Sequence, residues 1–193
     1  NEVYLGCTGG AGTATTDGWL TIMHVGNAGM CYQDSIEVDE LRHPIFVHVR
    51  RLMADTEGAG RTRGALSAYS EFSPLDCAMT VAYVSDGNAN PAMGVRGGLA
   101  GGASSQFLKR ADGSLEPVPG CAEVVVAPGE AMVSISCGGG GYGLPQDRDV
   151  ARVLDDVSEG WISRERAETV YGVAVTEALA LDAARTAALR SVR

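Results

Sequence analysis

Hydrophobic and polar residues alternate along several short stretches of the chain. The clearest alternation lies at 45–50, where Ile45, Val47 and Val49 alternate with Phe46, His48 and Arg50. A period of two is that of a β-strand, because successive side chains point to opposite faces of a sheet. Apolar runs of strand length predict further strands at 19–25, 65–72, 77–84, 105–110, 114–119, 123–127 and 131–137.

Turn residues between these runs predict β-hairpins. Pro128-Gly129 is expected to join the last two runs as the strongest hairpin, because proline sets φ at the second turn position and glycine accepts a positive φ at the third. Asp112-Gly113 predicts a type I′ hairpin between the runs on either side of it. The runs at 65–72 and 77–84 flank a short polar turn and predict another hairpin.

Beyond residue 145 the period changes to that of a helix. Apolar residues recur at 150, 153, 154, 157 and 161, behind Asp147 or Asp149 as the capping residue. Ser163 is expected to cap a second short helix that ends near 171–172, and Thr176 to open a third through the alanine-rich tail. The chain therefore predicts an α+β fold, with a mainly antiparallel β body and glycine-rich loops at 1–143 and a helical carboxy-terminal segment at 144–193.

The charge of the chain narrows the classes of partner. Its 193 residues carry a formal net charge of −9, with a sequence pI near 4.7. This charge would repel a phosphate backbone or an anionic membrane, so neither nucleic acid nor a membrane is an expected partner. No apolar run approaches the roughly 20 residues that span a bilayer, and the amino end lacks the features of a signal peptide, which predicts a cytoplasmic location.

The cysteines indicate the redox compartment of the protein, and the first residue indicates how the chain arises. Its five cysteines show no CxxC spacing, which is typical of free thiols in a reducing compartment. Initiator methionine is normally removed only ahead of small residues, so we expect Asn1 to arise from processing, a split gene or truncation.

The chain has 26 glycines, and 17 of them gather in stretches at 7–18, 56–64, 94–103 and 137–145. Glycine allows two backbones to approach closely and adopts φ values that other residues rarely do. Gly138, Gly140 and Gly143 satisfy the GxGxxG pattern of dinucleotide-binding folds. However, Leu144-Pro145 follows where the phosphate-binding helix should begin, so a dinucleotide site is disfavoured.

Local motifs for other chemistry are weak. The histidines His24, His43 and His48 are nowhere paired at ligand spacing, so we predict no metal site for this chain alone. No GxSxG motif supports a serine hydrolase. Cys7 lies in GCTGG, where backbone N–H groups could lower a thiol pKa, but most cysteines are small buried hydrophobes, and both roles stay open.

Three segments carry a more specific pattern: SIEVDELRHPIFV at 35–47, EGAGRTRGAL at 57–66 and PGEAMVSISCGGGGYGLPQDRD at 128–149. Together they resemble the carboxy-terminal part of the hydantoinase B/oxoprolinase family. The last segment is the most specific, with a Pro-Gly turn, a glycine tetrad, Tyr-Gly and Pro-x-x-Arg-Asp. The chain departs from the family pattern at Glu57, Ala65 and Leu144, which leaves the identity of the substrate open.

This resemblance implies an enzyme made of several parts. A hydantoinase A-type subunit would bind ATP with Mg and phosphorylate the oxygen of a small cyclic amide, and the B-type part would complete the reaction. The resemblance also implies a divalent metal, Mn or Zn, in the amino-terminal part of the B-type subunit. That part is a second expected partner, and no cofactor is predicted for this chain alone.

The leading prediction is the carboxy-terminal part or small subunit of an ATP-dependent cyclic amide hydrolase of the hydantoinase or 5-oxoprolinase type, inactive by itself. One alternative is a subunit of an ATP-dependent ketone carboxylase of the acetone or acetophenone carboxylase type, which bicarbonate dependence would distinguish. Another is a non-catalytic structural module of such a complex.

Two groups of candidate site residues follow from the family-like stretches. The acids Asp17, Glu37 and Glu40 are candidate catalytic residues, because a carboxylate can orient water or hold the edge of a metal. A salt bridge or a turn cap is the alternative role for each. The loop candidates would either donate N–H groups to developing negative charge or pack tightly at a subunit contact; they are Gly9, Gly10, Gly138, Gly139, Gly140, Gly141, Tyr142 and Gly143.

Overall fold

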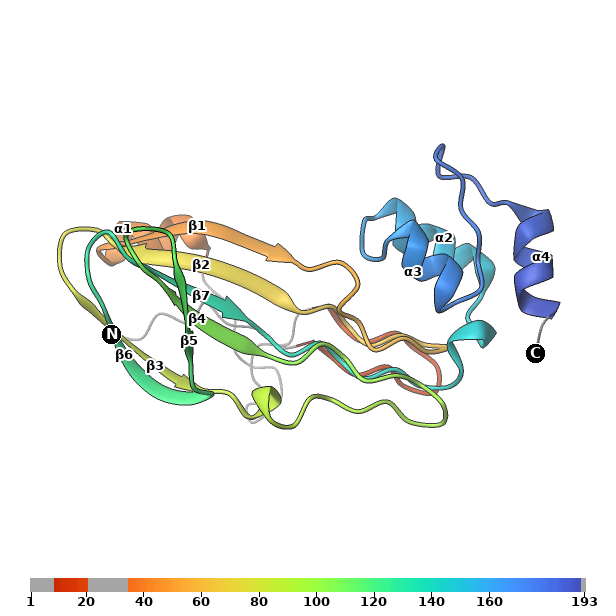
Figure 1. Ribbon diagram of the computed structural model, residues 1–193, viewed down its shortest axis with the longest axis horizontal. Coiled ribbons are helices and arrows are strands. Elements are labelled where there is room, and N and C mark those ends of the chain that lie inside the picture. The colour runs from red at the N-terminus through yellow and green to blue at the C-terminus, as the bar shows by residue number, and fades with distance from the viewer. Residues whose placement is uncertain (1–8, 21–34, 192–193) are drawn as a thin grey trace.

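The computed structural model describes residues 9–20 and 35–191. It has the α+β fold that the sequence predicts: antiparallel sheets form one end, extended glycine-rich segments the middle and helices the carboxy-terminal end (Figure 1). Its elements are α1 (Ile36–Arg42), β1 (Ile45–Leu52), β2 (Ala68–Pro74), β3 (Met79–Val84), η2 (Asp86–Asn88), β4 (Ser105–Lys109), β5 (Leu115–Val118), β6 (Cys121–Val126), β7 (Ala131–Ile135), η3 (Pro145–Asp147), α2 (Val150–Ser158), α3 (Arg164–Thr169) and α4 (Ala183–Ser191).

The strands form a five-stranded sheet of order β1-β2-β7-β4-β5 and a two-stranded sheet of β3 and β6, both antiparallel. Alternate residues of the larger sheet, among them Phe72, Leu108 and Met132, face a common core. Apolar residues of β3 and β6 pack against the same core from the other side. The alternation of the strands therefore places one apolar face of each sheet against the other.

Two of the predicted hairpins are wrong in their strand pairing. β2 pairs with β1 and β7, whereas β3 pairs with β6, and β6 and β7 likewise belong to different sheets. The turn at Pro128-Gly129 does form, since Glu130 N–H donates to the Ala127 carbonyl at 3.0 Å and Gly129 has φ +89°. A turn signal fixes where the chain reverses, but here the two strands leave it for opposite sides of the core.

The predicted hairpin at Asp112-Gly113 is correct in pairing, because β4 and β5 are neighbours. Its turn type differs from the prediction. Gly113 N–H donates to the Arg110 carbonyl at 2.8 Å, and Gly113, with φ +84°, follows as the single left-handed residue. A type I turn followed by such a glycine closes a three-residue loop, whereas type I′ would also need a positive φ at Asp112.

Two of the three helix starts predicted for the carboxy-terminal segment are confirmed. The Asp149 carboxylate accepts a hydrogen bond from Ala151 N–H at 2.7 Å at the start of α2, and Ser163 caps α3, as predicted. The prediction for Thr176 is wrong, because its backbone and side chain bond to Ala180 in a turn. α4 begins seven residues later, at Ala183, where Asp182 accepts a hydrogen bond from the backbone N–H of Arg185.

Two further differences lie near the amino end. Helix α1 was not predicted, and Ser35 caps it by accepting a hydrogen bond from Val38 N–H at 3.3 Å. Of the strand predicted at 19–25, residues 19 and 20 are not in a strand, and the rest lies outside the described residues, as does Cys7.

Glycine-rich segments far apart in the sequence lie side by side between the sheet and the helices (Figure 1). We call the segments 9–18, 56–66, 92–102 and 137–143 the glycine bundle. Backbone hydrogen bonds of 2.8 to 2.9 Å join its central segment, 137–143, to each of the others. A side chain at Gly139 would collide with the Gly10 carbonyl oxygen. The bundle therefore requires glycine for close backbone contact.

Candidate functional site

The structure places Asp17 in the first segment of the glycine bundle, facing the start of the helical region. Arg148 holds its carboxylate with two hydrogen bonds, from Nη1 to Oδ1 at 2.7 Å and from Nη2 to Oδ2 at 2.9 Å. Oδ1 also accepts the Arg63 backbone N–H at 2.9 Å, and Oδ2 lies 3.4 Å from Nη1 of Arg152. Both carboxylate oxygens are therefore fixed by donors.

Asp17 is one end of a buried chain of ion pairs, which we call the Asp17–Arg148 network. Arg148 also pairs with Asp156 on α2 at 2.8 Å, and Asp156 pairs with Arg63 at 3.0 Å. The Arg63 guanidinium lies 4.6 Å from the ring centroid of Trp161, where a cation–π contact is favourable. The two aspartates balance the two buried arginines, which is the condition for charge in a protein interior.

The pKa values of these acids reflect the network. Burial raises the pKa of Asp17, but hydrogen bonds and charge from Arg148 and Arg63 outweigh it and leave that pKa below its ordinary value. Burial dominates for Asp156 and raises its pKa, although Arg63 and Arg148 oppose the shift. An aspartate whose pKa is lowered is a weak proton acceptor, so the site favours an ion-pairing role for Asp17.

A second buried carboxylate, Glu57, joins the glycine bundle to α3. Its Oε1 accepts hydrogen bonds from Nε of Arg166 at 2.6 Å and from the hydroxyl of Tyr171 at 2.9 Å, whereas Oε2 is buried without a partner among the described residues. Burial raises the pKa of Glu57, and the charge of Arg166 opposes that rise. Departure from the family pattern at this position thus coincides with a specific buried contact.

The structure does not bring Glu37 and Glu40 near Asp17. Both lie on α1, which packs beside β1 at the sheet end, whereas the segment that holds Asp17 runs toward the helices (Figure 1). Glu40 Oε1 accepts the Val47 backbone N–H at 2.8 Å and so links α1 to β1, and Glu37 is exposed. The three candidate acids do not form one site.

The loop candidates do gather, in the glycine bundle. Most of their N–H groups donate to backbone carbonyls, as Gly138 does to Gly102 at 2.8 Å and Gly139 to Ala65 at 2.9 Å. Further such donors are Gly9, Gly10, Gly141, Tyr142 and Gly143. These contacts favour the packing role, and the stabilisation of developing charge stays a prediction. The Tyr142 ring lies 5.9 Å from the guanidinium carbons of both Arg61 and Arg96.

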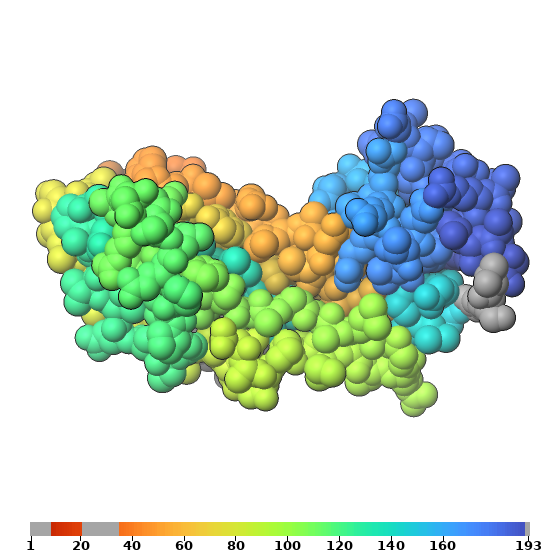
Figure 2. Space-filling view, viewed as in Figure 1, coloured from red at the N-terminus to blue at the C-terminus, as the bar shows by residue number. Residues whose placement is uncertain are grey.

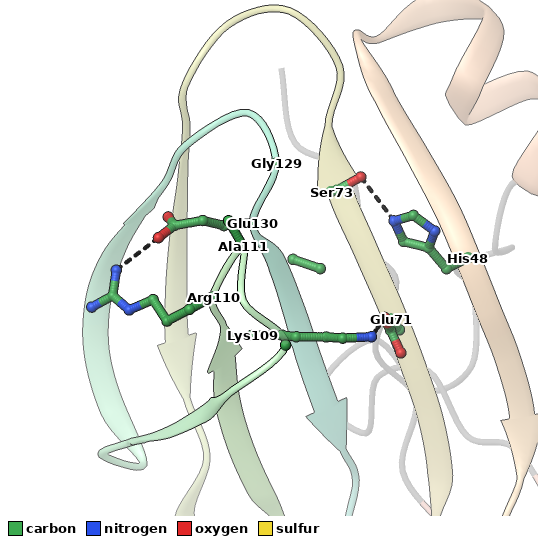
Figure 3. A pocket seen from close by; sticks show the side chains of 10 residues that line it. His48, Glu71, Ser73, Lys109, Arg110, Ala111, Gly129 and Glu130 are labelled. Atoms are coloured by element: carbon green, nitrogen blue, oxygen red, sulfur yellow. Dashed lines mark hydrogen bonds and ion pairs between the residues drawn. The ribbon is translucent and has the colours of Figure 1, made fainter.

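Two shallow pockets, each of about 260 Å³, lie outside the buried networks. One opens beside the Asp17–Arg148 network and is lined by Ala14, Thr15, Arg61, Thr62, Asp147, Asp149 and Arg152. The other lies at the end of the larger sheet (Figure 3), where Lys109 pairs with Glu71 at 2.8 Å and His48 Nε2 lies 2.9 Å from Ser73 Oγ. The second pocket is lined by residues of several strands, so no local sequence motif predicts it.

Sequence reasoning missed Arg63, Arg148 and Asp156 as members of a site. Arg63 and Arg148 lie in the segments that carry the family pattern, so the sequence marked both arginines. It did not show that both pair with Asp156. Asp156 lies beside Val153 and Val157, which are buried on α2. An acid on the buried face of an amphipathic helix was the signal for a buried ion pair.

The described residues offer no cluster of three or more His, Cys, Asp or Glu side chains that could hold a metal. The divalent ion that the family resemblance implies belongs to another part of the subunit, so its site stays a prediction. Within the described ranges, no helix is long and apolar enough to cross a membrane.

The comparison with models of known protein families shows to which family the chain belongs. The hydantoinase B/oxoprolinase model matches residues 2–145. The chain belongs to the hydantoinase B/oxoprolinase family. It is 32% identical to the beta subunit of caprolactamase from Pseudomonas jessenii, over 95% of this chain and 32% of that protein. The putative B-type subunit of a D-/L-hydantoinase from a Pseudomonas strain is 29% identical, over 81% of this chain and 27% of its own length.

Two solved structures share the fold of this chain. The ATP-dependent caprolactamase of Pseudomonas jessenii matches 96% of this chain and 33% of its own, with a TM-score of 0.78 and 29% identity. A nucleotide-free acetone carboxylase matches 96% of this chain and 29% of its own, also with a TM-score of 0.78, but its 21% identity shows the fold alone. The chain spans about a third of the length of these relatives.

Proposed function

We propose that this chain is the carboxy-terminal part of the B-type subunit of an ATP-dependent cyclic amide hydrolase. The observation that carries the proposal is its 32% identity to the beta subunit of caprolactamase over 95% of its residues. The family pattern around the glycine tetrad and Arg148 coincides with the glycine bundle and the Asp17–Arg148 network.

In this proposal an A-type partner activates the amide by transferring a phosphoryl group from ATP to its carbonyl oxygen. An O-phosphorylated amide is a much better electrophile than the amide itself. Water adds to its carbon, the ring C–N bond breaks as the nitrogen takes up a proton, and the resulting acyl phosphate is hydrolysed by a second water to the carboxylate and phosphate. The residues of this chain would hold the wall of the site in place: the Asp17–Arg148 network fixes the bundle to α2, and Glu57 fixes it to α3. Such fixed positions are what a preorganised site requires.

The experiment is to assemble the complete B-type subunit containing this chain with its A-type partner. ATP hydrolysis and ring opening are then measured together on caprolactam, hydantoin and 5-oxoproline, with and without bicarbonate, and carboxylation is measured on acetone and acetophenone under the same conditions. We expect ring opening that depends on ATP and not on bicarbonate. Carboxylation of a ketone that requires bicarbonate would instead support the carboxylase alternative, and ATP-independent or absent turnover on all three amides would contradict the proposal.

The same assembly tests the candidate acids. Asp17→Asn, Glu37→Gln and Glu40→Gln are compared for kcat, KM and retention of the complex. Loss of kcat in a variant that still assembles would support a catalytic role for that acid. Full turnover in all three would support the non-catalytic structural module. Of the three substitutions, Glu37→Gln is the least expected to disturb folding, because the Glu37 side chain is exposed.

A further inference from the structure

The two sheets face each other through polar side chains at the end of the core that adjoins the glycine bundle. Ser85, which follows β3, and Ser104, which precedes β4, meet there with 2.6 Å between their hydroxyl oxygens. Side chains two positions apart on a strand share a face, so Tyr83 and Gln106 form the next pair inward along β3 and β4. The pair after that reaches Leu108, which belongs to the apolar core. We call Tyr83, Ser85, Ser104 and Gln106 the polar strip.

Two atoms of the polar strip are buried without a hydrogen-bond partner among the described residues. They are the hydroxyl oxygen of Tyr83 and Oε1 of Gln106, and Gln106 as a whole is 4% exposed. Buried polar groups nearly always have a partner in folded proteins, because an unpaired group has given up its hydrogen bonds to water for nothing. The two serines bond each other, so within the strip this deficit is confined to the Tyr83–Gln106 pair.

The larger sheet places further hydroxyl groups beside this pair. Ser134 on β7 is the register partner of both Gln106 on β4 and Ser70 on β2, and Ser70 is 4% exposed. Burial raises the pKa of Tyr83 to about 12, and the nearby Ser134 side chain opposes that rise. Two positions away on β2 and β7, the same strand faces carry phenylalanine and methionine in the core. The smaller serines leave more room between the sheets at this level.

A ligand in this position must be small and must both donate and accept hydrogen bonds. Gln106 Oε1 only accepts, whereas the tyrosine and serine hydroxyls can donate or accept. Water combines both roles, and buried waters make about three hydrogen bonds to groups that otherwise lack a partner. On the face drawn in Figure 2, the green segments that contain β4, β5 and β6 cover the sheet end of the molecule. We propose that a buried water molecule bridges the Tyr83 hydroxyl and Gln106 Oε1, with Ser134 as its third partner, and so links the two sheets.

A crystal structure of the complete B-type subunit, at a resolution that shows ordered water, tests the site directly. We expect one water oxygen at about 2.5–3.0 Å from both Tyr83 Oη and Gln106 Oε1. A direct hydrogen bond between these two side chains would overturn the proposal. So would a dry contact in which neither atom is paired, or a side chain from the rest of the subunit in the position of the water.

A double-mutant cycle tests whether the two side chains share this water. Tyr83→Phe and Gln106→Leu each remove one partner and keep a side chain of similar shape. Each should lower the urea midpoint of unfolding, and the double variant should lose less than both losses together, because the first substitution already breaks the bridge. Tyr171→Phe is the matched control, since that buried hydroxyl bonds Glu57 directly and lies in the other core. Its loss and that of Gln106→Leu should add.

Additive losses for Tyr83→Phe and Gln106→Leu would also overturn the shared water. If either variant fails to fold, the crystal structure of the wild-type subunit decides by itself. The water site lies within this chain and depends on neither ATP nor the amide. A subunit that holds the water but opens no cyclic amide would therefore keep this proposal and refute the proposed function.

Discussion

Arg148 and Asp17, 131 positions apart in the chain, are joined by two parallel hydrogen bonds of 2.7 and 2.9 Å. The pair connects the first segment of the glycine bundle to the residue just before the Asp149 cap of α2. Because Arg148 also bonds Asp156, a single guanidinium neutralises acids from two parts of the fold. A planar guanidinium can serve two carboxylates in this way, whereas a lysine ammonium cannot reproduce the geometry.

Replacing Arg148 should therefore destabilise the protein strongly. Arg148→Met leaves Asp17 and the buried Asp156 without their shared cation, and breaking a buried ion pair on one side costs about 3–5 kcal/mol. Chemical unfolding followed by circular dichroism measures the loss. Arg164→Met is the control, because that arginine is exposed and 3.9 Å from its partner, and it should change stability by less than about 0.5 kcal/mol. Equal effects of the two substitutions would contradict the role given to the network.

The lowered pKa of Asp17 predicts how its contribution to stability depends on pH. The folded state favours the ionised carboxylate, so the contribution is complete above the ordinary pKa of 3.8 and is lost as the pH falls through the lower folded value. The difference in unfolding free energy between wild type and Asp17→Asn should be large at pH 7 and shrink in acid. Urea unfolding across pH 2 to 7 tests this, and a difference that grew in acid would be inconsistent with the ion pair.

Glu57 should show the opposite dependence. Its pKa lies above the ordinary 4.5, so the folded state holds the proton more tightly than the unfolded chain does. Stability contributed by this group is present below pH 4.5 and declines as the pH rises through the raised folded value. Glu57→Gln should remove that decline in the same unfolding series, with Glu37→Gln as the background for an exposed glutamate. An unchanged pH profile in Glu57→Gln would assign the decline to other groups.

Sequence patterns predicted the elements whose signals are local. The alternation around Ile45 marks β1, and Asp149 and Ser163 begin the helices that they were expected to cap. The end of α3 was also marked, since Gly172 follows with φ +65°. In each case the signal lies in residues close together in the sequence, so no knowledge of distant segments is required.

Strand partners and the site could not be predicted from local patterns alone. The turn at Pro128-Gly129 is correct, yet its strands separate, because burial of their apolar faces decides the partner. Asp17 was singled out, but Arg148, which holds both of its carboxylate oxygens, lies 131 positions away. Such contacts depend on how the glycine bundle assembles, and glycine content alone specifies neither the order nor the register of its segments.

The glycine bundle predicts a sharp contrast between two glycine substitutions. Gly139→Ala would drive a methyl group into the Gly10 carbonyl oxygen with backbone on the other side as well, so we expect a loss of at least about 3 kcal/mol or a failure to fold. Gly113→Ala meets no atom within 4 Å and has only its φ of +84° to overcome, which costs about 1–2 kcal/mol. Soluble yield and urea midpoints of both variants distinguish the two causes. Comparable losses would contradict the role given to close contact between segments of the glycine bundle at Gly139.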